Sequence, residues 1–286
     1  MVIAESGQAG RAFVTPALRE RLLAGVETTG EAVMAIYRRP FDVETKADDS
    51  PVTEADLCAH HALLELLDEV TPAVPVLSEE SEAVPYAIRR AWRRYWLVDP
   101  LDGTKEFIRR SGDFTLNVAL IEDGVPTFGI VHAPTLGVSW FGQLGEGAWR
   151  REGVETHTIG VRALPDPDRE PWCVMGSRSH GLSALAAFME RLPRHALVSR
   201  GSSLKLCLVA EGVADLYPRF GPTSEWDTAA GQAVVTAAGG EVLDARTLMP
   251  LRCNYQASLL NPAFIACGER DSRWEQALAA SLEEVD

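Results

Sequence analysis

The stretch that decides the fold is WLVDPLDGTKEF, residues 96–107. Its apolar start predicts a buried strand that ends at Pro100, because proline cannot donate to a central ladder. Asp99 and Asp102 lie at this end, and two carboxylates so close repel each other unless a cation lies between them. Hard cations such as Mg²⁺ prefer oxygen ligands, and the Leu101 carbonyl can supply another. The stretch therefore predicts a cation site at a strand end.

The residues that follow add a possible anion site. Gly103 and Thr104 lead into Lys105-Glu106-Phe107, which is typical of a helix start. Free backbone N–H groups at a helix N-terminus bind phosphate, so metal ligands and an anion site can share one segment. The competing interpretation is that Asp102 simply caps a helix in an ordinary loop.

Two further acidic positions lie at the ends of predicted elements. Glu79 and Glu80 follow the short apolar run 74–77, and Asp227 lies in SEWDTAAG at the expected start of a helix that stops at Gly239-Gly240. Taken singly, such carboxylates are typical of solvated surface or of a helix cap. Their joint occurrence at strand and helix ends favours an active site, because active sites gather there.

The rest of the pattern predicts a layered α/β architecture. Apolar spacing predicts helices over 15–38 and 53–70, the second opened by Thr53 with Asp56 in a capping box. The second helix offers Leu57, Leu63, Leu64 and Leu67 to the core. Antiparallel strands are expected over 114–121, 125–133 and 137–141. The polar segment 151–171 is a candidate boundary. We therefore expect an N-terminal α+β subdomain over 12–160 that carries most of the metal ligands. A C-terminal α/β subdomain over 161–286 would supply Asp227 and the specificity residues.

Composition limits the functional classes. Acidic residues outnumber basic ones by 41 to 27 over 286 residues, so a general nucleic-acid binder is excluded for lack of a basic footprint. A phosphorylated substrate would need a local reversal of charge, which a divalent metal supplies. The first residues carry neither a basic n-region nor a long apolar run, so no signal peptide or membrane segment is expected. The five scattered cysteines contain no CxxC, which favours reduced thiols and a cytoplasmic location.

Three motifs together carry a family resemblance. LSEE, WLVDPLDGT and WDTAAG resemble, in order and spacing, the signature regions of the inositol monophosphatase superfamily of lithium-sensitive, magnesium-dependent phosphatases. The resemblance covers roughly residues 15–265. DSPVTEAD, DPLDGTKEFI and GSSLKLCLVAEGVADLYPRFGPTSEWDTAAG look like one branch, the bacterial 3'(2'),5'-bisphosphate nucleotidases of the CysQ type. The implied fold is the α-β-α-β-α sandwich shared with fructose-1,6-bisphosphatase.

The resemblance also implies roles for individual residues. The implied ligands of two or three Mg²⁺ ions are Glu79, Asp99, the Leu101 carbonyl, Asp102 and Asp227. The implied catalytic residues are Glu79, Thr104, Asp56 and Asp102, where Glu79 and Thr104 orient the attacking water and Asp56 holds Thr104. The implied substrate-binding residues are Glu79, Leu101, Asp102, Gly103, Thr104, Gly201, Ser202, Ser203, Lys205, Arg219 and Asp227.

One departure from the inositol-type pattern bears on the substrate. Those members carry an acidic sugar-binding residue shortly before the WD of the third motif, and Arg219 lies near that place here. An arginine suits a second phosphate because its fork binds phosphate through two parallel hydrogen bonds. Lys205 could assist, although a lysine on a helix surface is the plainer interpretation.

The implied reaction removes the 3'-phosphate of adenosine 3',5'-bisphosphate without a phosphoenzyme, which would clear a by-product of sulfur metabolism. The family also implies 3'-phosphoadenylyl sulfate as a substrate. Inositol monophosphatase or fructose-1,6-bisphosphatase activity stays open, as does a non-catalytic divalent-cation-binding module. A haloacid-dehalogenase mechanism is excluded, because its two aspartates lie two residues apart and Asp99 and Asp102 lie three apart. The histidines lack metal-type spacing. The sequence leaves the oligomeric state open, and contacts to the nucleotide base are expected near 176–203.

Overall fold

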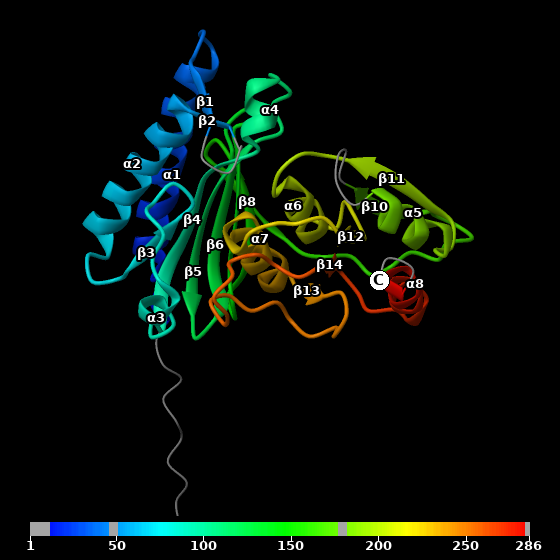
Figure 1. Cartoon of the computed structure of the whole chain (residues 1–286). Coiled ribbons are helices and arrows are strands. Elements are labelled where there is room, and N and C mark those ends of the chain that lie inside the picture. Colours follow the sequence, from blue (N-terminus) through cyan, green and yellow to red (C-terminus); the bar gives the residue numbers. More distant parts are fainter. Residues whose placement is uncertain (1–11, 46–50, 177–181, 284–286) are drawn as a thin grey trace, which may run out of the picture.

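The computed structural model describes residues 12–45, 51–176 and 182–283. It is built in five layers, with helices outside and between two sheets (Figure 1). Its helices are α1 (Pro16–Tyr37), α2 (Glu54–Val70), α3 (Tyr86–Arg89), α4 (Thr104–Ile108), α5 (Leu182–Glu190), α6 (Leu204–Ala210), α7 (Glu225–Ala237) and α8 (Ser272–Glu283). The predicted α-β-α-β-α sandwich is confirmed.

The larger sheet has seven strands in the order β3-β4-β5-β6-β7-β8-β9. They are β3 (Val76–Ser78), β4 (Arg94–Asp102), β5 (Thr115–Glu122), β6 (Val125–Ala133), β7 (Val138–Gln143), β8 (Gly147–Glu152) and β9 (Glu155–Ile159). β3 runs parallel to β4, and every later pairing is antiparallel, so the predicted meander is confirmed. A short antiparallel pair, β1 (Val43–Thr45) and β2 (Pro51–Thr53), precedes α2.

The smaller sheet has five strands in the order β11-β10-β12-β14-β13. They are β10 (Trp172–Gly176), β11 (His195–Ser199), β12 (Leu216–Arg219), β13 (Glu241–Asp244) and β14 (Phe264–Cys267). β10 pairs in parallel with β11 and β12, whereas β14 runs antiparallel to β12 and β13. The proposed subdomain boundary at 160/161 coincides with the passage of the chain from one sheet to the other, and the division into two subdomains stays a prediction.

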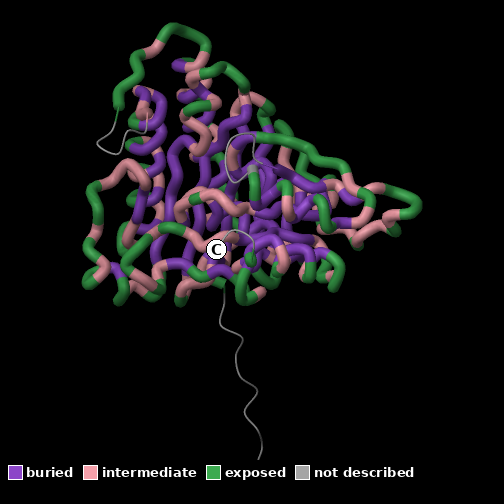
Figure 2. The backbone as a smooth tube through the Cα atoms, turned by 45° about the vertical axis from the view of Figure 1, so that its right-hand side comes forward, coloured by how far each residue is buried: buried purple, intermediate pink, exposed green. Residues whose placement is uncertain are grey.

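Three buried apolar clusters separate the layers, because successive strand residues point to opposite faces of a sheet. Trp96 and Val118 of the larger sheet pack toward α1 and α2. Their neighbours Leu97 and Ala119 pack toward α6 and α7, which also meet the inner face of the smaller sheet. The outer face of the smaller sheet packs on α5 and α8, for example through Phe188. Figure 2 shows the buried stretches running through both sheets.

Helix α7 is held between the sheets by small residues. The Cβ of a side chain at Gly129 of β6 would lie 2.4 Å from the Ala230 carbonyl oxygen and 2.9 Å from the Ala233 Cβ. The neighbouring strand β7 makes the same kind of contact, since a Cβ at Gly142 would lie 2.8 Å from the Cα of Val234. The helix therefore lies directly on the backbone of the sheet, which fixes the position of its N-terminus at the sheet end.

Part of the candidate boundary segment 151–171 belongs to the larger sheet, because β8 and β9 extend that sheet to Ile159. β9 is an exposed edge strand, and exposed edges carry polar side chains, so its composition resembles that of a loop. Leu57 was expected in the core of α2 but is exposed.

Among the described residues, no helix is long and apolar enough to cross a membrane.

Candidate active site

The stretch 96–107 contains a β-bulge at the end of strand β4. Asp99 pairs with Asn117 and Asp102 pairs with Thr115, so β4 has one extra residue between these positions. Contrary to the prediction, β4 does not end at Pro100, because a bulge leaves a residue out of the ladder and a proline is tolerated there. The Leu101 N–H donates to the Asp99 Oδ1 at 3.1 Å, which orients that carboxylate within the bulge.

Asp227 is presented by the first turn of α7. The helix begins at Glu225, and Ser224 is its N-cap, so the predicted start at Asp227 was two residues late. Asp227 completes a capping box, in which the Ser224 N–H donates to its Oδ2 at 2.9 Å. A carboxylate has about four lone-pair sites, so the cap leaves acceptor capacity for a cation. The cap and the predicted ligand role are therefore compatible.

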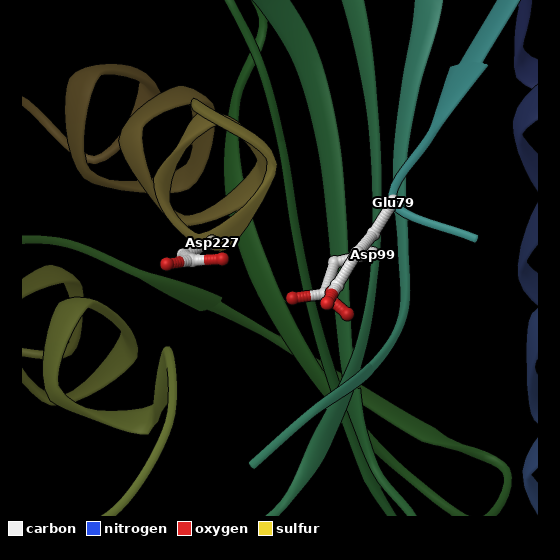
Figure 3. A group of neighbouring side chains, drawn as sticks. All are labelled: Glu79, Asp99 and Asp227. Carbon is white, nitrogen blue, oxygen red and sulfur yellow. The ribbon is translucent and has the colours of Figure 1, made fainter. Parts of the chain in front are cut away.

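Three predicted ligands from distant parts of the chain converge. Glu79, Asp99 and Asp227 each offer a carboxylate oxygen, and these oxygens lie within 4.8 Å of one another. Glu79 follows β3, and its backbone N–H donates to the Val98 carbonyl of β4 at 3.1 Å. Figure 3 shows the side chains of Glu79 and Asp99 beside each other at the sheet end, with Asp227 reaching toward them from α7. Throughout the part of the chain that the structure describes, this is the one such group of acidic, cysteine or histidine ligands.

The electrostatics of this carboxylate group favour a bound cation. Burial raises the pKa of Asp99 well above its usual range, and the charges of Glu79, Asp102 and Asp227 raise it further. Burial also raises the pKa of Asp227, as do the charges of Asp102 and Glu79. Ionised carboxylates in such a place need a neutralising partner. All the converging side-chain donors are hard oxygens, so the residues fit a divalent cation such as Mg²⁺.

Asp102 lies at the edge of this group. Its Oδ2 accepts a hydrogen bond from the Ser203 N–H at 2.6 Å. Burial raises the pKa of Asp102 to about 6, although the charge of Lys205 and the Ser203 hydrogen bond lower it. Asp102 therefore faces both the carboxylate group and the loop 200–203. It does not cap α4, because Gly103 is the N-cap.

Thr104 and Asp56 meet as the resemblance implied. The Thr104 hydroxyl donates to the Asp56 Oδ1 at 2.9 Å, and it lies 3.3 Å from the Leu101 carbonyl oxygen. The other Asp56 oxygen accepts from the Thr53 N–H at 2.7 Å in the predicted capping box. Burial raises the pKa of Asp56, while the hydrogen bonds from Thr53 and Thr104 lower it. The cap of α2 thus holds the side chain that orients Thr104.

A pocket of about 250 Å³ opens beside the carboxylates. Asp102, Gly103, Gly201, Ser202, Ser203 and Asp227, all predicted to bind substrate, line it. Its basic lining residues are Lys105, Arg109, Arg200, Lys205 and Arg219. Five cations around one pocket are notable in a chain whose formal net charge is −14. The pocket therefore suits a ligand with more than one negative charge.

The structure revises the interpretation of Lys205. It is buried rather than on a helix surface, and burial lowers its pKa to about 8. Its Nζ donates to the Ser202 carbonyl at 2.6 Å and to the Arg200 carbonyl at 3.2 Å. Lys205 therefore holds the loop that forms one wall of the pocket. The Arg219 Nη2 donates to the Pro222 carbonyl at 3.1 Å, and Arg219 also lines the pocket.

Sequence reasoning missed several pocket residues. Arg109 directly follows DPLDGTKEFI and Arg200 directly precedes GSSLKL, but neither motif marks them as pocket residues, and only the fold places them together. Asn117, a buried residue outside the pocket lining, gave a usable signal, because it interrupts the apolar strand sequence TLNVALIE. Base contacts were expected within 176–203, of which residues 177–181 lie outside the described part of the chain. The Gly103 φ of +97° suits glycine, and α4 has only five residues, so its predicted phosphate site is a single short turn.

Fold and site together define a layered α/β phosphohydrolase with a carboxylate cation centre between two sheets. The inositol monophosphatase family model matches residues 19–286, and the chain belongs to this family.

Two named relatives and one crystal structure are similar to this chain over most of its length. The chain is 50% identical over 237 residues to the 3'(2'),5'-bisphosphate nucleotidase CysQ of Escherichia coli (strain K12), which covers 82% of this chain and 93% of the relative. It is 48% identical over 247 residues to the protein of the same name from Salmonella typhimurium, covering 86% and 97%. The crystal structure of CysQ from Bacteroides thetaiotaomicron, at 39% identity, superposes with a TM-score of 0.79 over 91% of this chain and all of the other.

Proposed function

We propose that this chain is a magnesium-dependent phosphomonoesterase that hydrolyses the 3'-phosphate of adenosine 3',5'-bisphosphate to give AMP and phosphate. The observation that carries the proposal is the convergence of Glu79, Asp99 and Asp227 beside a pocket rich in cations. The similarity to relatives named 3'(2'),5'-bisphosphate nucleotidase supports the same substrate class. A cytoplasmic role in sulfur metabolism, with 3'-phosphoadenylyl sulfate as a second substrate, follows from the same resemblance and belongs to the proposal.

The carboxylates would hold the metal. Members of the inositol monophosphatase family depend on metal in general. Here Glu79, Asp99 and Asp227 would be ligands, joined by Asp102 and the Leu101 carbonyl, and we propose two or three Mg²⁺ ions. When bound, such ions neutralise phosphate charge, lower the pKa of a bound water and stabilise the leaving oxygen.

Thr104 would orient the attacking water. Because its hydroxyl proton points to Asp56, its oxygen keeps lone pairs free to accept a hydrogen bond from a water. Glu79 would accept the second proton of that water. The water oxygen, which keeps one proton, forms a bond to phosphorus as the bond between phosphorus and the 3' oxygen breaks. The 3' oxygen leaves as the 3'-hydroxyl with a proton taken from solvent, and the proton on Glu79 returns to solvent. No side chain becomes phosphorylated in this reaction.

Replacing Thr104 by valine tests this role. Valine keeps the shape but removes the hydroxyl, so we expect kcat to fall by about 100-fold, the size of a positioned proton-transfer contact. Thr104→Ser keeps the hydroxyl and should stay within about fivefold of the wild type. Steady-state phosphate release measures both variants, and equal activity of the valine and wild-type enzymes would remove Thr104 from the mechanism.

The second phosphate would be recognised by Arg219. Its guanidinium lines the pocket and can bind phosphate through two parallel hydrogen bonds. Lys205 would act on the same group mainly through its charge and through the loop it holds, because its Nζ already donates to two carbonyls.

Replacing Arg219 by alanine should therefore change specificity. The loss of one charge-assisted contact, about 2–3 kcal/mol, predicts a fall of about 30- to 150-fold in kcat/KM for adenosine 3',5'-bisphosphate. Inositol 1-phosphate and 3'-AMP lack the second phosphate, so their kcat/KM should change less than threefold. Equal losses on all three substrates would refute the proposed role of Arg219.

A substrate panel tests the proposed function as a whole. Purified protein with Mg²⁺ should release phosphate from adenosine 3',5'-bisphosphate with a higher kcat/KM than from inositol 1-phosphate or fructose 1,6-bisphosphate. Fastest turnover of either sugar phosphate would replace the proposed substrate. No phosphate release from any of the three would favour the non-catalytic cation-binding module.

A further inference from the structure

A hydrogen-bonded row of buried polar side chains lies beneath the site and plays no part in the mechanism above. Asn117 is 1% exposed on β5, directly opposite Asp99 in the strand register. Thr115 lies two residues earlier, opposite Asp102. Opposite residues of an antiparallel pair point to the same face of a sheet, as do residues two apart. All four side chains therefore lie on the face that carries the carboxylates.

The orientation of the Asn117 amide sets the directions of the hydrogen bonds in this row. The Ser203 hydroxyl lies 2.8 Å from the Asn117 Oδ1 and 2.7 Å from the Thr115 hydroxyl oxygen. The Asn117 carbonyl oxygen can only accept, so Ser203 must donate its one hydroxyl proton to it. Thr115 must then donate to Ser203. The hydrogen bonds therefore run from Thr115 to Ser203 and from Ser203 to Asn117.

The same orientation determines where the other end of the Asn117 amide, its Nδ2, lies. With its carbonyl oxygen toward the Ser203 hydroxyl, Asn117 turns its Nδ2 away from that hydroxyl. Asp102 is close by, because its Oδ2 accepts from the backbone N–H of the same Ser203. The buried Asn117 Nδ2 has no hydrogen-bond partner within the described residues. A buried donor left in this state is unfavourable, which gives it a reason to complete a bond to Asp102.

We infer that Asn117 is a positioning residue, oriented by Ser203, which donates to the Asp102 carboxylate and holds it in place for the cation. The inference rests on the proposed function in so far as Asp102 is a ligand. Asp102 would then be held by two neutral donors, the Ser203 N–H and the Asn117 amide. Hydrogen bonds to a ligating carboxylate fix its orientation, and losing such a partner typically weakens metal affinity 10- to 100-fold.

Metal binding, measured without turnover, tests this inference. Isothermal titration of the metal-free protein with Mg²⁺ should give a dissociation constant about 10-fold higher for Asn117→Leu than for the wild type. Ser203→Ala should give a smaller rise, because its backbone N–H remains but the Asn117 amide is no longer oriented. Thr115→Val is the matched control, since Thr115 donates only to Ser203, and its dissociation constant should stay within twofold.

A merely structural role would give a different pattern. It would lower the melting temperature in EDTA for Asn117→Leu while leaving the Mg²⁺ dissociation constant unchanged, and that result would overturn the inference. If Asn117→Leu does not fold, an unchanged constant in Ser203→Ala overturns it equally. Failure of the proposed function is seen separately, as the absence of phosphate release by wild-type protein that binds Mg²⁺.

Discussion

Replacing Asp99 by asparagine is expected to lower kcat/KM for adenosine 3',5'-bisphosphate by at least about 100-fold, because the variant loses a central ligand of the cation that neutralises the phosphate. Asparagine has the same shape, and its carbonyl oxygen can still accept from the Leu101 N–H. The loss therefore reports on the missing charge and not on a disturbed bulge. Phosphate release with saturating Mg²⁺ measures the effect.

The same substitution should stabilise the metal-free protein. Asp99 is buried among the charges of Glu79, Asp102 and Asp227, so removing its charge relieves repulsion. We expect a rise in melting temperature of about 3 °C in EDTA, together with loss of most of the stabilisation by Mg²⁺. Asp123→Asn is the control, since Asp123 is a surface residue that pairs with Arg93. An Asp99→Asn enzyme with wild-type turnover and an unchanged response to Mg²⁺ would contradict the site.

Replacing Gly129 by alanine is expected to lower both stability and kcat, although the residue lies away from the carboxylates. The added Cβ would lie 2.4 Å from the Ala230 carbonyl oxygen, a backbone atom that cannot move without α7. Overpacking of this kind costs on the order of 3 kcal/mol of stability. Because α7 carries Asp227, a shift of about 1 Å should also lower kcat about 100-fold.

Gly160→Ala is the matched control for this substitution. The nearest atom to its added Cβ would be the Ala238 carbonyl oxygen at 3.7 Å, an ordinary contact. It should change stability by less than about 0.5 kcal/mol and leave turnover unchanged. Urea unfolding and phosphate release measure both variants. Wild-type stability of Gly129→Ala would mean that α7 does not lie on the sheet as described.

The parts of the fold that depend on local chemistry could be predicted from the sequence. The capping box of Thr53 and Asp56, the antiparallel strands and the strand before Asp99 follow from neighbouring residues. Strand β9 could not be recognised, because an exposed edge strand carries the polar residues of a loop. The continuation of β4 through Pro100 was also missed, since a bulge depends on the register with β5.

The site was predictable only in part, for a related reason. Spacing indicated a cation site at Asp99 and Asp102. The position of Glu79 and Asp227 at element ends favoured an active site, but only the family resemblance named them as ligands of the same cations. Their convergence depends on how α7 packs between the sheets, which no local pattern contains. Burial of Lys205 likewise follows from the layer that covers it. The bonds of Asn117 depend on a loop 86 residues away in sequence.

The most direct test of the account is anomalous diffraction from a crystal of the wild-type protein soaked in Mn²⁺, which substitutes for Mg²⁺ at oxygen sites. The account predicts anomalous peaks within bonding distance of the carboxylate oxygens of Glu79, Asp99 and Asp227. It would be contradicted if the protein released phosphate in Mn²⁺ while the peaks lay elsewhere and none lay between these three side chains.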